Sequence, residues 1–150
     1  MGTTTTESEG TVTTDEHAAV GPGETGTGLD SNVAGALSYL LGVVTGVVFY
    51  VIEPDDEFVR FHAAQSIATF GVLFVAYVVL SVLGTMVSVA FMTGGGAGFF
   101  VGSMLSLVLG LVWLVLGLAS LGLWLYLMLS AYQGKTVRVP VAAGLADRLV

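Results

Sequence analysis

The sequence predicts an all-α membrane protein with three transmembrane helices behind a disordered N-terminal tail, and three observations lead to this prediction. Hydrophobic residues make up 55% of the 150 residues and charged residues only 10%, which is too little polar surface for a water-soluble domain. No Asp, Glu, Lys or Arg occurs between residues 61 and 134. Glycine and proline divide the apolar part into segments long enough to cross a bilayer.

Residues 1–31 are predicted to be a disordered tail, and residues 32–150 the membrane domain. The tail holds six of the eleven acidic residues and no Lys or Arg. It has almost no large apolar side chains, so it cannot bury enough surface to offset the entropy of ordering. A secretory signal would need a basic start and an early apolar run, and this start has neither.

The first predicted span covers residues 33–52, an uncharged stretch of 20 residues. This length matches a bilayer core of roughly 30 Å at about 1.5 Å per residue. The acidic segment 53–57 ends the span, because carboxylates enter hydrocarbon only at high cost and Pro54 disfavours helical geometry in the residue before it.

The second and third spans are predicted near residues 64–92 and 102–132, with a Gly-rich turn at 93–98 between them. Both segments exceed the minimum crossing length. Tilt, or a short interfacial helix over residues 99–104, would absorb the excess length.

The basic residues predict the orientation of these spans in the cell membrane. Three spans place Arg60 on the same side as Lys135, Arg138 and Arg148, and the positive-inside rule makes that side the cytoplasm. The N-terminus is then expected outside and the C-terminus inside. A fourth span would divide the basic residues between the two sides.

Small residues repeat every four positions in two of the predicted spans, where another helix backbone can approach closely. Two interpretations are open, packing within the chain and a seam between two copies. The residues concerned are Ala34, Ser38, Gly42 and Gly46 in the first span, and Gly102, Ser106 and Gly110 in the third.

The polar residues Arg60, His62 and Gln65 form the main candidate site. If a helix begins here, His62 and Gln65 share one face with Phe58 and Phe61, and Arg60 can pair with a preceding carboxylate. His62 could relay protons or bind a substrate at the membrane boundary. The alternative is an interfacial anchor that orients the second span.

Several function classes are not expected. The chain has no cysteine and only four Lys and Arg residues, which argues against thiolate chemistry and nucleic-acid binding. Neither a metal site nor a cofactor is expected, because the second histidine, His17, lies in the tail. No hydrolase motif is present, and the segment 94–98 is not followed by the G-K-[ST] of a phosphate loop, so no enzymatic activity is predicted.

Two stretches carry a resemblance to a known family: FVRFHAAQS at residues 58–66 and AYQGKTVRVPVAAGLADRL at residues 131–149. Together with the hydrophobic spacing, they resemble a family of small uncharacterised archaeal and bacterial membrane proteins, itself distantly likened to the import-channel component of the chloroplast inner envelope. The resemblance implies a compact multi-span membrane domain and no catalytic residues. The long acidic tail and the pI near 4.4 suggest a halophilic source.

The C-terminal stretch is predicted to cap the last span and to lie at the cytoplasmic face. Gly134 can end the helix, Lys135 and Arg138 suit lipid headgroups, and residues 145–149 suggest a short interfacial helix. Residues 53–66 and 133–150 would then form one docking surface.

Two functions follow from this arrangement. The first is a structural or protein-interaction component of the cell membrane, which the family analogy would connect with protein translocation. The second is a small transporter or channel subunit that acts as an oligomer. The lipid bilayer is an expected partner in both cases. A continuous polar path through His62 and Gln65 would favour the second function, and a packed interior would favour the first.

Overall fold

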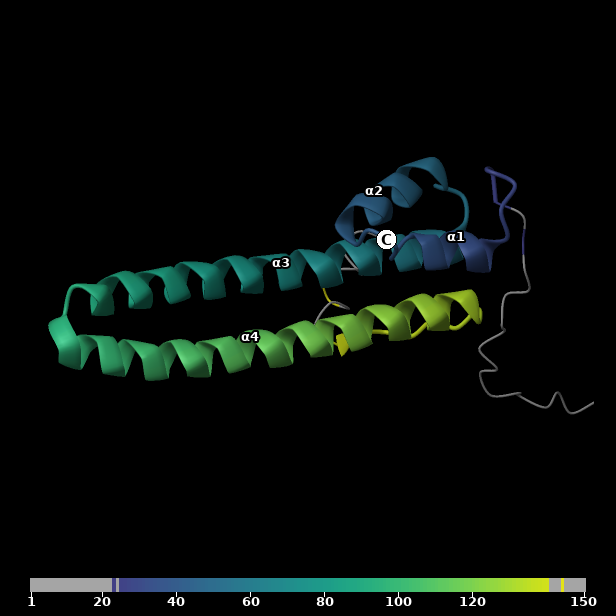
Figure 1. The fold of residues 1–150 in the computed structure, drawn as a ribbon. Coiled ribbons are helices and arrows are strands. Elements are labelled where there is room, and N and C mark those ends of the chain that lie inside the picture. The colour runs from purple at the N-terminus through teal and green to yellow at the C-terminus, as the bar shows by residue number, and fades with distance from the viewer. Residues whose placement is uncertain (1–22, 24, 141–143, 145–150) are drawn as a thin grey trace, which may run out of the picture.

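The computed structural model describes residues 23, 25–140 and 144, and this part of the chain contains four α-helices and no strand (Figure 1). The long helices α3 (Glu57–Met92) and α4 (Gly95–Tyr132) form an antiparallel hairpin. The short helices α1 (Ser31–Leu37) and α2 (Val43–Ile52) lie beside one end of this hairpin, where α3 begins. The predicted all-α class is confirmed.

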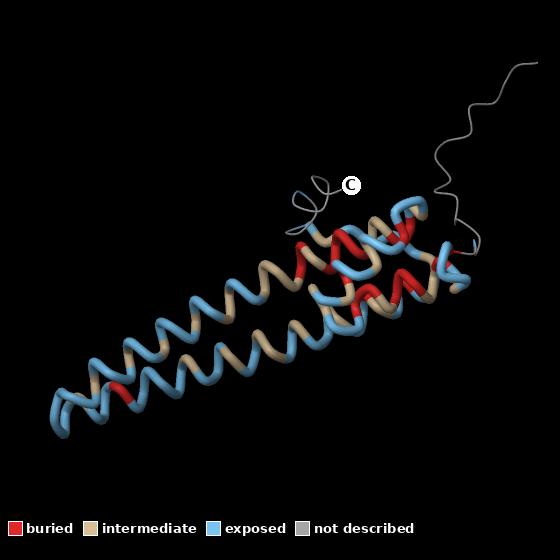
Figure 2. Tube along the Cα trace, turned by 90° about the horizontal axis from the view of Figure 1, so that it is seen from above, coloured by how far each residue is buried: buried red, intermediate tan, exposed pale blue. Residues whose placement is uncertain are grey.

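The molecule therefore has two parts that differ in burial. The bundle end comprises α1, α2, the residues of α3 up to Phe70, the residues of α4 from Leu123 onward and the extended segment 135–139. The remainder of α3 and α4 is called the hairpin. Buried residues gather at the bundle end, whereas the residues of the hairpin are exposed or half-buried, apart from the buried Gly102 (Figure 2).

Both α3 and α4 are long and apolar enough to cross a membrane, and they are the only such helices among the described residues. They contain 36 and 38 residues, or about 54 and 57 Å at 1.5 Å per residue. The predicted turn at 93–98 is shorter than expected, because α4 already begins at Gly95, whose φ is +68°. No separate helix covers residues 99–104, which belong to α4.

Several serine and threonine hydroxyls in the hairpin donate to the backbone of their own helix. Thr85 Oγ1 donates to the Ser81 carbonyl at 2.9 Å, and Ser88 Oγ donates to the Gly84 carbonyl at 2.8 Å. Every such bond removes a group that would otherwise need water, so these hydroxyls suit the hydrocarbon region of a bilayer.

The predicted first span at residues 33–52 is not one helix. Residues 38–42 form a turn that separates α1 from α2, and Gly42 has a φ of +61°. Only glycine adopts this conformation without strain, and Gly42 is the N-cap residue from which α2 starts. The prediction of a continuous first span is therefore wrong, and a third membrane-spanning helix is not confirmed.

Two side chains donate hydrogen bonds to carbonyls at the two ends of this turn. Ser66 Oγ of α3 donates to the Gly42 carbonyl at 3.0 Å, and Thr45 Oγ1 donates to the Ser38 carbonyl at 3.0 Å. The Gly42 carbonyl also accepts the Gly46 amide at 3.0 Å, whereas the Thr45 hydroxyl provides for the Ser38 carbonyl, which would cost several kcal/mol if left free in an apolar stretch.

The segment before α1 returns to the same end of the molecule as the segment after α2. Ser31, the first residue of α1, donates through Oγ to Asp56, the N-cap residue of α3. Glu53, which follows α2, accepts hydrogen bonds from the backbone of Gly26 and Thr27. Residues 25–31 of the predicted tail are therefore ordered by contacts with the loop before α3, whereas residues 1–22 and 24 lie outside the described residues.

The predicted helix end at Gly134 is confirmed. Gly134 has a φ of +72° and donates its N–H to the Ala131 carbonyl, and the N–H of Lys135 bonds to the Ser130 carbonyl. This pair of bonds is the Schellman motif that ends many helices. The short helix predicted at residues 145–149 lies outside the described residues.

Substituting Gly46 tests the packing of α2 on α3. A Cβ atom at Gly46 would lie 3.1 Å from the Ala63 carbonyl oxygen and 3.1 Å from Ile67 Cγ1, whereas one at Gly71 would meet nothing within 4 Å. We expect Gly46→Leu to lower the unfolding free energy in detergent by about 1–3 kcal/mol through overpacking. The control Gly71→Leu should change it little. Equal effects of the two variants would contradict the close contact.

Candidate functional site

A buried polar cluster, here called the polar core, joins the helices of the bundle end. The Tyr39 hydroxyl lies 3.0 Å from His62 Nδ1, and Trp124 Nε1 of α4 donates to the Tyr39 carbonyl at 2.8 Å. Gln65 Nε2 donates to the Val137 carbonyl at 2.8 Å. Tyr39, His62 and Gln65 are at most 1% exposed. The polar core therefore connects the turn after α1 with α3, α4 and the segment 135–139.

Aromatic rings enclose His62 within this cluster. Its ring centroid lies 4.4 Å from that of Phe58, 5.2 Å from that of Phe61 and 5.7 Å from that of Tyr39. An imidazole packed in this way has no free face toward solvent. The structure therefore places His62 in the interior of the bundle end rather than on a surface.

One face of α3 carries polar atoms that the described residues leave without a hydrogen-bond partner. They are Nε2 of His62, Oε1 of Gln65 and Oγ1 of Thr69. These residues follow one another at i, i+3 and i+7, which places them along one side of the helix. Polar groups buried in this way are uncommon in folded proteins, so this face has hydrogen-bonding capacity beyond what the packing uses.

The basic residues lie around the polar core. Arg60 is partly buried, with its guanidinium 5.4 Å from the Tyr50 ring centroid. Arg138 is exposed, and its guanidinium lies 5.8 Å from the Phe61 ring centroid. Lys135 is exposed and donates to Gln133 Oε1 at 2.8 Å. The predicted site residues are thus brought to one end of the molecule, with the three cations outside and His62 and Gln65 beneath them.

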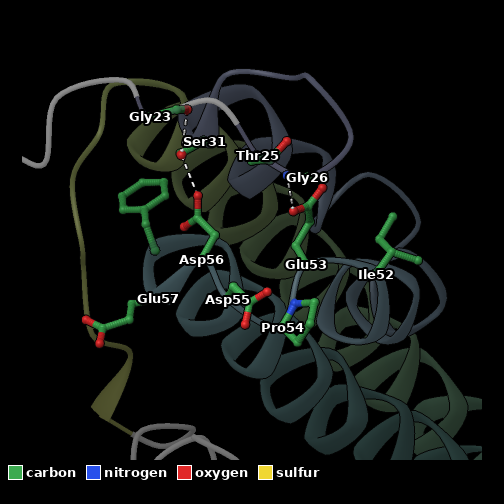
Figure 3. A pocket seen from close by; sticks show the side chains of 11 residues that line it. Gly23, Thr25, Gly26, Ser31, Ile52, Glu53, Pro54, Asp55, Asp56 and Glu57 are labelled. Carbon is green, nitrogen blue, oxygen red and sulfur yellow. Dashed lines mark hydrogen bonds between the residues drawn. The ribbon is translucent and has the colours of Figure 1, made fainter.

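A pocket of about 430 Å³ opens beside the loop that leads into α3 (Figure 3). Glu53 accepts the Gly26 and Thr27 amides at 2.8 and 2.9 Å, and Asp56 accepts the Val59 amide at 2.9 Å. Asp55 and Glu57 are exposed. Among the described residues, no group of three or more His, Cys, Asp or Glu could hold a metal ion. The buried carboxylate of Glu53 and the half-buried carboxylate of Asp56 thus bind backbone amides of this chain.

Hydrogen bonding lowers the pKa of Glu53. The Thr27 side chain contributes most, and the backbone amides of Gly26 and Thr27 add to it, while burial acts in the opposite direction. The ionised carboxylate is therefore the form that holds residues 26 and 27 against the loop before α3.

The predicted packing residues divide between two roles. Ala34, Ser38 and Gly46 are buried against the rest of the chain, and Gly42 forms the turn. Gly102 is also buried, since a Cβ there would lie 2.5 Å from Phe91 Cβ. In contrast, Ser106 and Gly110 are exposed, and a Cβ at Gly110 would meet nothing within 4 Å. The break at residues 38–42 distributes the first stripe over both short helices.

Sequence reasoning missed the central residues Tyr39, Trp124 and Glu53. The indole N–H of Trp124 was a usable signal, because a tryptophan buried in an apolar helix generally finds an acceptor for this group. The ionisable Glu53, directly after an apolar segment, was a second signal. Neither residue reveals its partner, because the partners lie 85 and 27 positions away.

An apolar helical hairpin joined to a bundle with a polar core defines a small α-helical membrane protein. Residues 28–146 match the model of the magnetosome magnetite crystal formation protein family, MamF/MmsF, and the chain belongs to this family. No solved structure matches the chain.

Archaeal membrane proteins are among its relatives. The UPF0132 membrane protein MJ1443 of Methanocaldococcus jannaschii is 36% identical over 129 residues, which cover 84% of this chain and 94% of that protein. A UPF0132 membrane protein of Archaeoglobus fulgidus is 32% identical over 122 residues, covering 81% and 97%. The resemblance to a family of archaeal membrane proteins is confirmed, whereas the likeness to the chloroplast import component is not supported.

Removing the Gln65 amide tests whether it holds the segment 135–139. We expect Gln65→Leu to raise the rate at which a thiol reagent labels Val139→Cys, because Val139 packs against the bundle core. Loss of a bond worth about 1 kcal/mol corresponds to a rate increase of about fivefold. The matched control is Gln133→Leu at an exposed position, which should leave the rate unchanged. An unchanged rate in Gln65→Leu would show that packing alone holds the segment.

The lowered pKa of Glu53 predicts a pH-dependent contribution to stability. Because the folded pKa lies below the unfolded one, this contribution is complete above the unfolded pKa and disappears as the pH falls through the folded pKa. At neutral pH, Glu53→Gln should lower the unfolding free energy by about 1.5–3 kcal/mol, the range for hydrogen bonds to charged groups.

In strong acid the difference between Glu53→Gln and the unsubstituted protein should vanish, because both side chains are then neutral. Asp55→Asn, at an exposed position of the same loop, is the control and should have a small effect at every pH. Chemical denaturation in detergent across this pH range measures both variants. A Glu53→Gln effect that stays constant with pH would rule out the ionised carboxylate as the stabilising form.

Proposed function

We propose that this protein is a structural and protein-interaction component of the cell membrane, with a docking surface at the bundle end. The observation that carries the proposal is the grouping of Arg60, Lys135 and Arg138 around one packed core, although they come from α3 and from the segment after α4. Cations gathered on a rigid support suit a partner that presents acidic groups.

His62 and Gln65 act as positioning residues in this proposal. Both are buried, so a partner would not touch them directly. Gln65 bonds to the Val137 carbonyl, next to Arg138, and His62 packs against Phe61, the ring over which Arg138 lies. Both contacts support the position of Arg138 relative to α3.

The orientation belongs to the same proposal. Arg60, Lys135 and Arg138 lie at the bundle end, so the positive-inside rule favours the cytoplasm for this end and for the segment that follows α4. The sequence alone predicted three spans with the N-terminus outside. The contacts of Gly26 and Thr27 with Glu53 instead support two spans, with residues 25–31 also on the cytoplasmic side.

The alternative is a transporter or channel subunit that works as an oligomer. It would need polar groups that continue through the membrane from His62 and Gln65. In the described part of the chain these two side chains are sealed by packing, which favours the interaction role. The relatives in archaea are named as membrane proteins, and the family description concerns magnetite crystal formation. Only the membrane location in these names is used for this chain.

Site-specific photo-crosslinking in native membranes tests the docking surface. A photo-reactive amino acid in place of Lys135 or Arg138 should give a discrete protein adduct, because these side chains are exposed at the bundle end. The control position is Leu114, an exposed apolar residue of the hairpin, which should yield adducts with lipid. Lipid adducts alone at all three positions would contradict a docking surface. Adducts between copies of this chain at Leu114 would favour the oligomeric alternative.

A further inference from the structure

The two short helices thicken the molecule at only one end. Ala36 of α1 and Tyr39 of the following turn pack against Leu127 and Ala131 of α4. Gly46 of α2 lies against Ala63 and Ser66 of α3. Beyond the pocket formed by Gly42, Phe70 and Phe74, only α3 and α4 continue (Figure 1). Four helices therefore share the cross-section of the bundle end, and two share that of the hairpin.

The depth of the added helices corresponds to half a bilayer. Ser31 at the start of α1 bonds to Asp56, and the carbonyl of Gly42 at the turn accepts from Ser66. Asp56 and Ser66 are ten positions apart, which is about 15 Å along a helix. A bilayer core is roughly 30 Å thick, so the pair α1–α2 reaches as deep as one leaflet.

The outer face of α2 is apolar, as expected for a helix surface that contacts lipid. Val44, Val47, Val48 and Val51 are 46–67% exposed, and α2 contains no charged residue. Charged side chains begin only at Glu53, at the same level as Asp55 and Asp56 in the loop before α3. Ser66 and Thr45 bond to two carbonyls of the turn, and Thr45 Oγ1 also accepts the Leu41 amide. These bonds lower the cost of placing the turn in hydrocarbon.

We propose that α1 and α2 form a re-entrant pair that occupies one leaflet, and that the protein is therefore a wedge that recognises curved membranes. Its partner on the α2 face is the lipid of that leaflet. Each added helix is about 10 Å across with its side chains, so the leaflet around the bundle end must make room for twice as many helices as the opposite leaflet. The wedge fits a membrane whose convex leaflet contains the bundle end. This inference does not depend on the docking surface proposed above.

The first measurement concerns topology and uses single cysteines, since the chain has none of its own. Asp30→Cys, Asp55→Cys and Gly96→Cys replace exposed residues before α1, before α3 and at the tip of the hairpin. In sealed vesicles, an impermeant thiol reagent should label Asp30→Cys and Asp55→Cys in the same fraction of molecules, and Gly96→Cys in the complementary fraction. Labelling of Asp30→Cys in the same fraction as Gly96→Cys would mean that residues 33–52 cross the membrane, and the wedge would be overturned.

The second measurement concerns curvature. The full chain is reconstituted into giant vesicles of phosphatidylcholine with some phosphatidylglycerol, and a narrow membrane tether is pulled outward from them. Impermeant dye on Asp55→Cys marks only molecules whose bundle end lies in the outer, convex leaflet of the tether. Their ratio to lipid should be at least about twofold higher in the tether than in the vesicle, which corresponds to about 0.4 kcal/mol.

The oppositely inserted molecules provide the matched control. Dye on Gly96→Cys marks molecules whose bundle end lies in the inner leaflet, and these should be depleted from the tether. Equal ratios for the two orientations would overturn the wedge. A disulfide dimer of Val47→Cys that forms at high dilution in lipid would also overturn it, because a second copy rather than lipid would then cover α2.

Discussion

A chain can reverse within an apolar stretch only where its backbone groups find partners other than water, and the arrangement of the whole bundle end depends on this constraint at Gly42. The Ser66 hydroxyl donates to the Gly42 carbonyl, and the Thr45 hydroxyl donates to the Ser38 carbonyl. With these bonds in place, residues 31–52 return to the level at which they began. Glu53 can then reach Gly26 and Thr27, and Asp56 can reach Ser31.

The same reversal explains why the polar core exists. α1 is short and ends beside α4, so that Tyr39 meets both His62 and the indole of Trp124. A single helix over residues 33–52 would carry Tyr39 past α3 at another angle and register, and His62 would lose its hydroxyl partner. The segment 135–139 closes the core from the other side through Gln65. Short-range glycine geometry and long-range hydrogen bonds thus depend on each other.

Features governed by local chemistry were predictable from the sequence. The Schellman end at Gly134 and the start of α3 near Asp56 follow from capping rules that act over a few residues. The two long apolar helices follow from 74 uncharged positions between Arg60 and Lys135. The break at Gly42 did not, because isolated glycines also occur inside membrane helices, and the deciding partner, Ser66, lies 24 positions away. The spacing predicted that His62 and Gln65 share one face of α3. It did not predict that α1 and the C-terminal segment bury them, for the same reason.

Hydrophobic length connects this architecture to the membrane. From Phe61 to Met92, α3 is uncharged for 32 residues, or about 48 Å, which exceeds a bilayer core of roughly 30 Å. Tilt alone would fit this length into the bilayer core only at an angle well beyond the average of about 20° for transmembrane helices. The far end of the hairpin offers another solution, because Thr93 and the glycines that follow form a small, polar tip that suits the headgroup region. With the bundle end in one leaflet, the 22 residues of α3 beyond Phe70, about 33 Å long, exceed the roughly 15 Å of the other leaflet core, so the hairpin tilts and its tip extends past the hydrocarbon of that leaflet. The reversal at Gly42 thus sets both the polar core and the unequal widths of the molecule in the two leaflets.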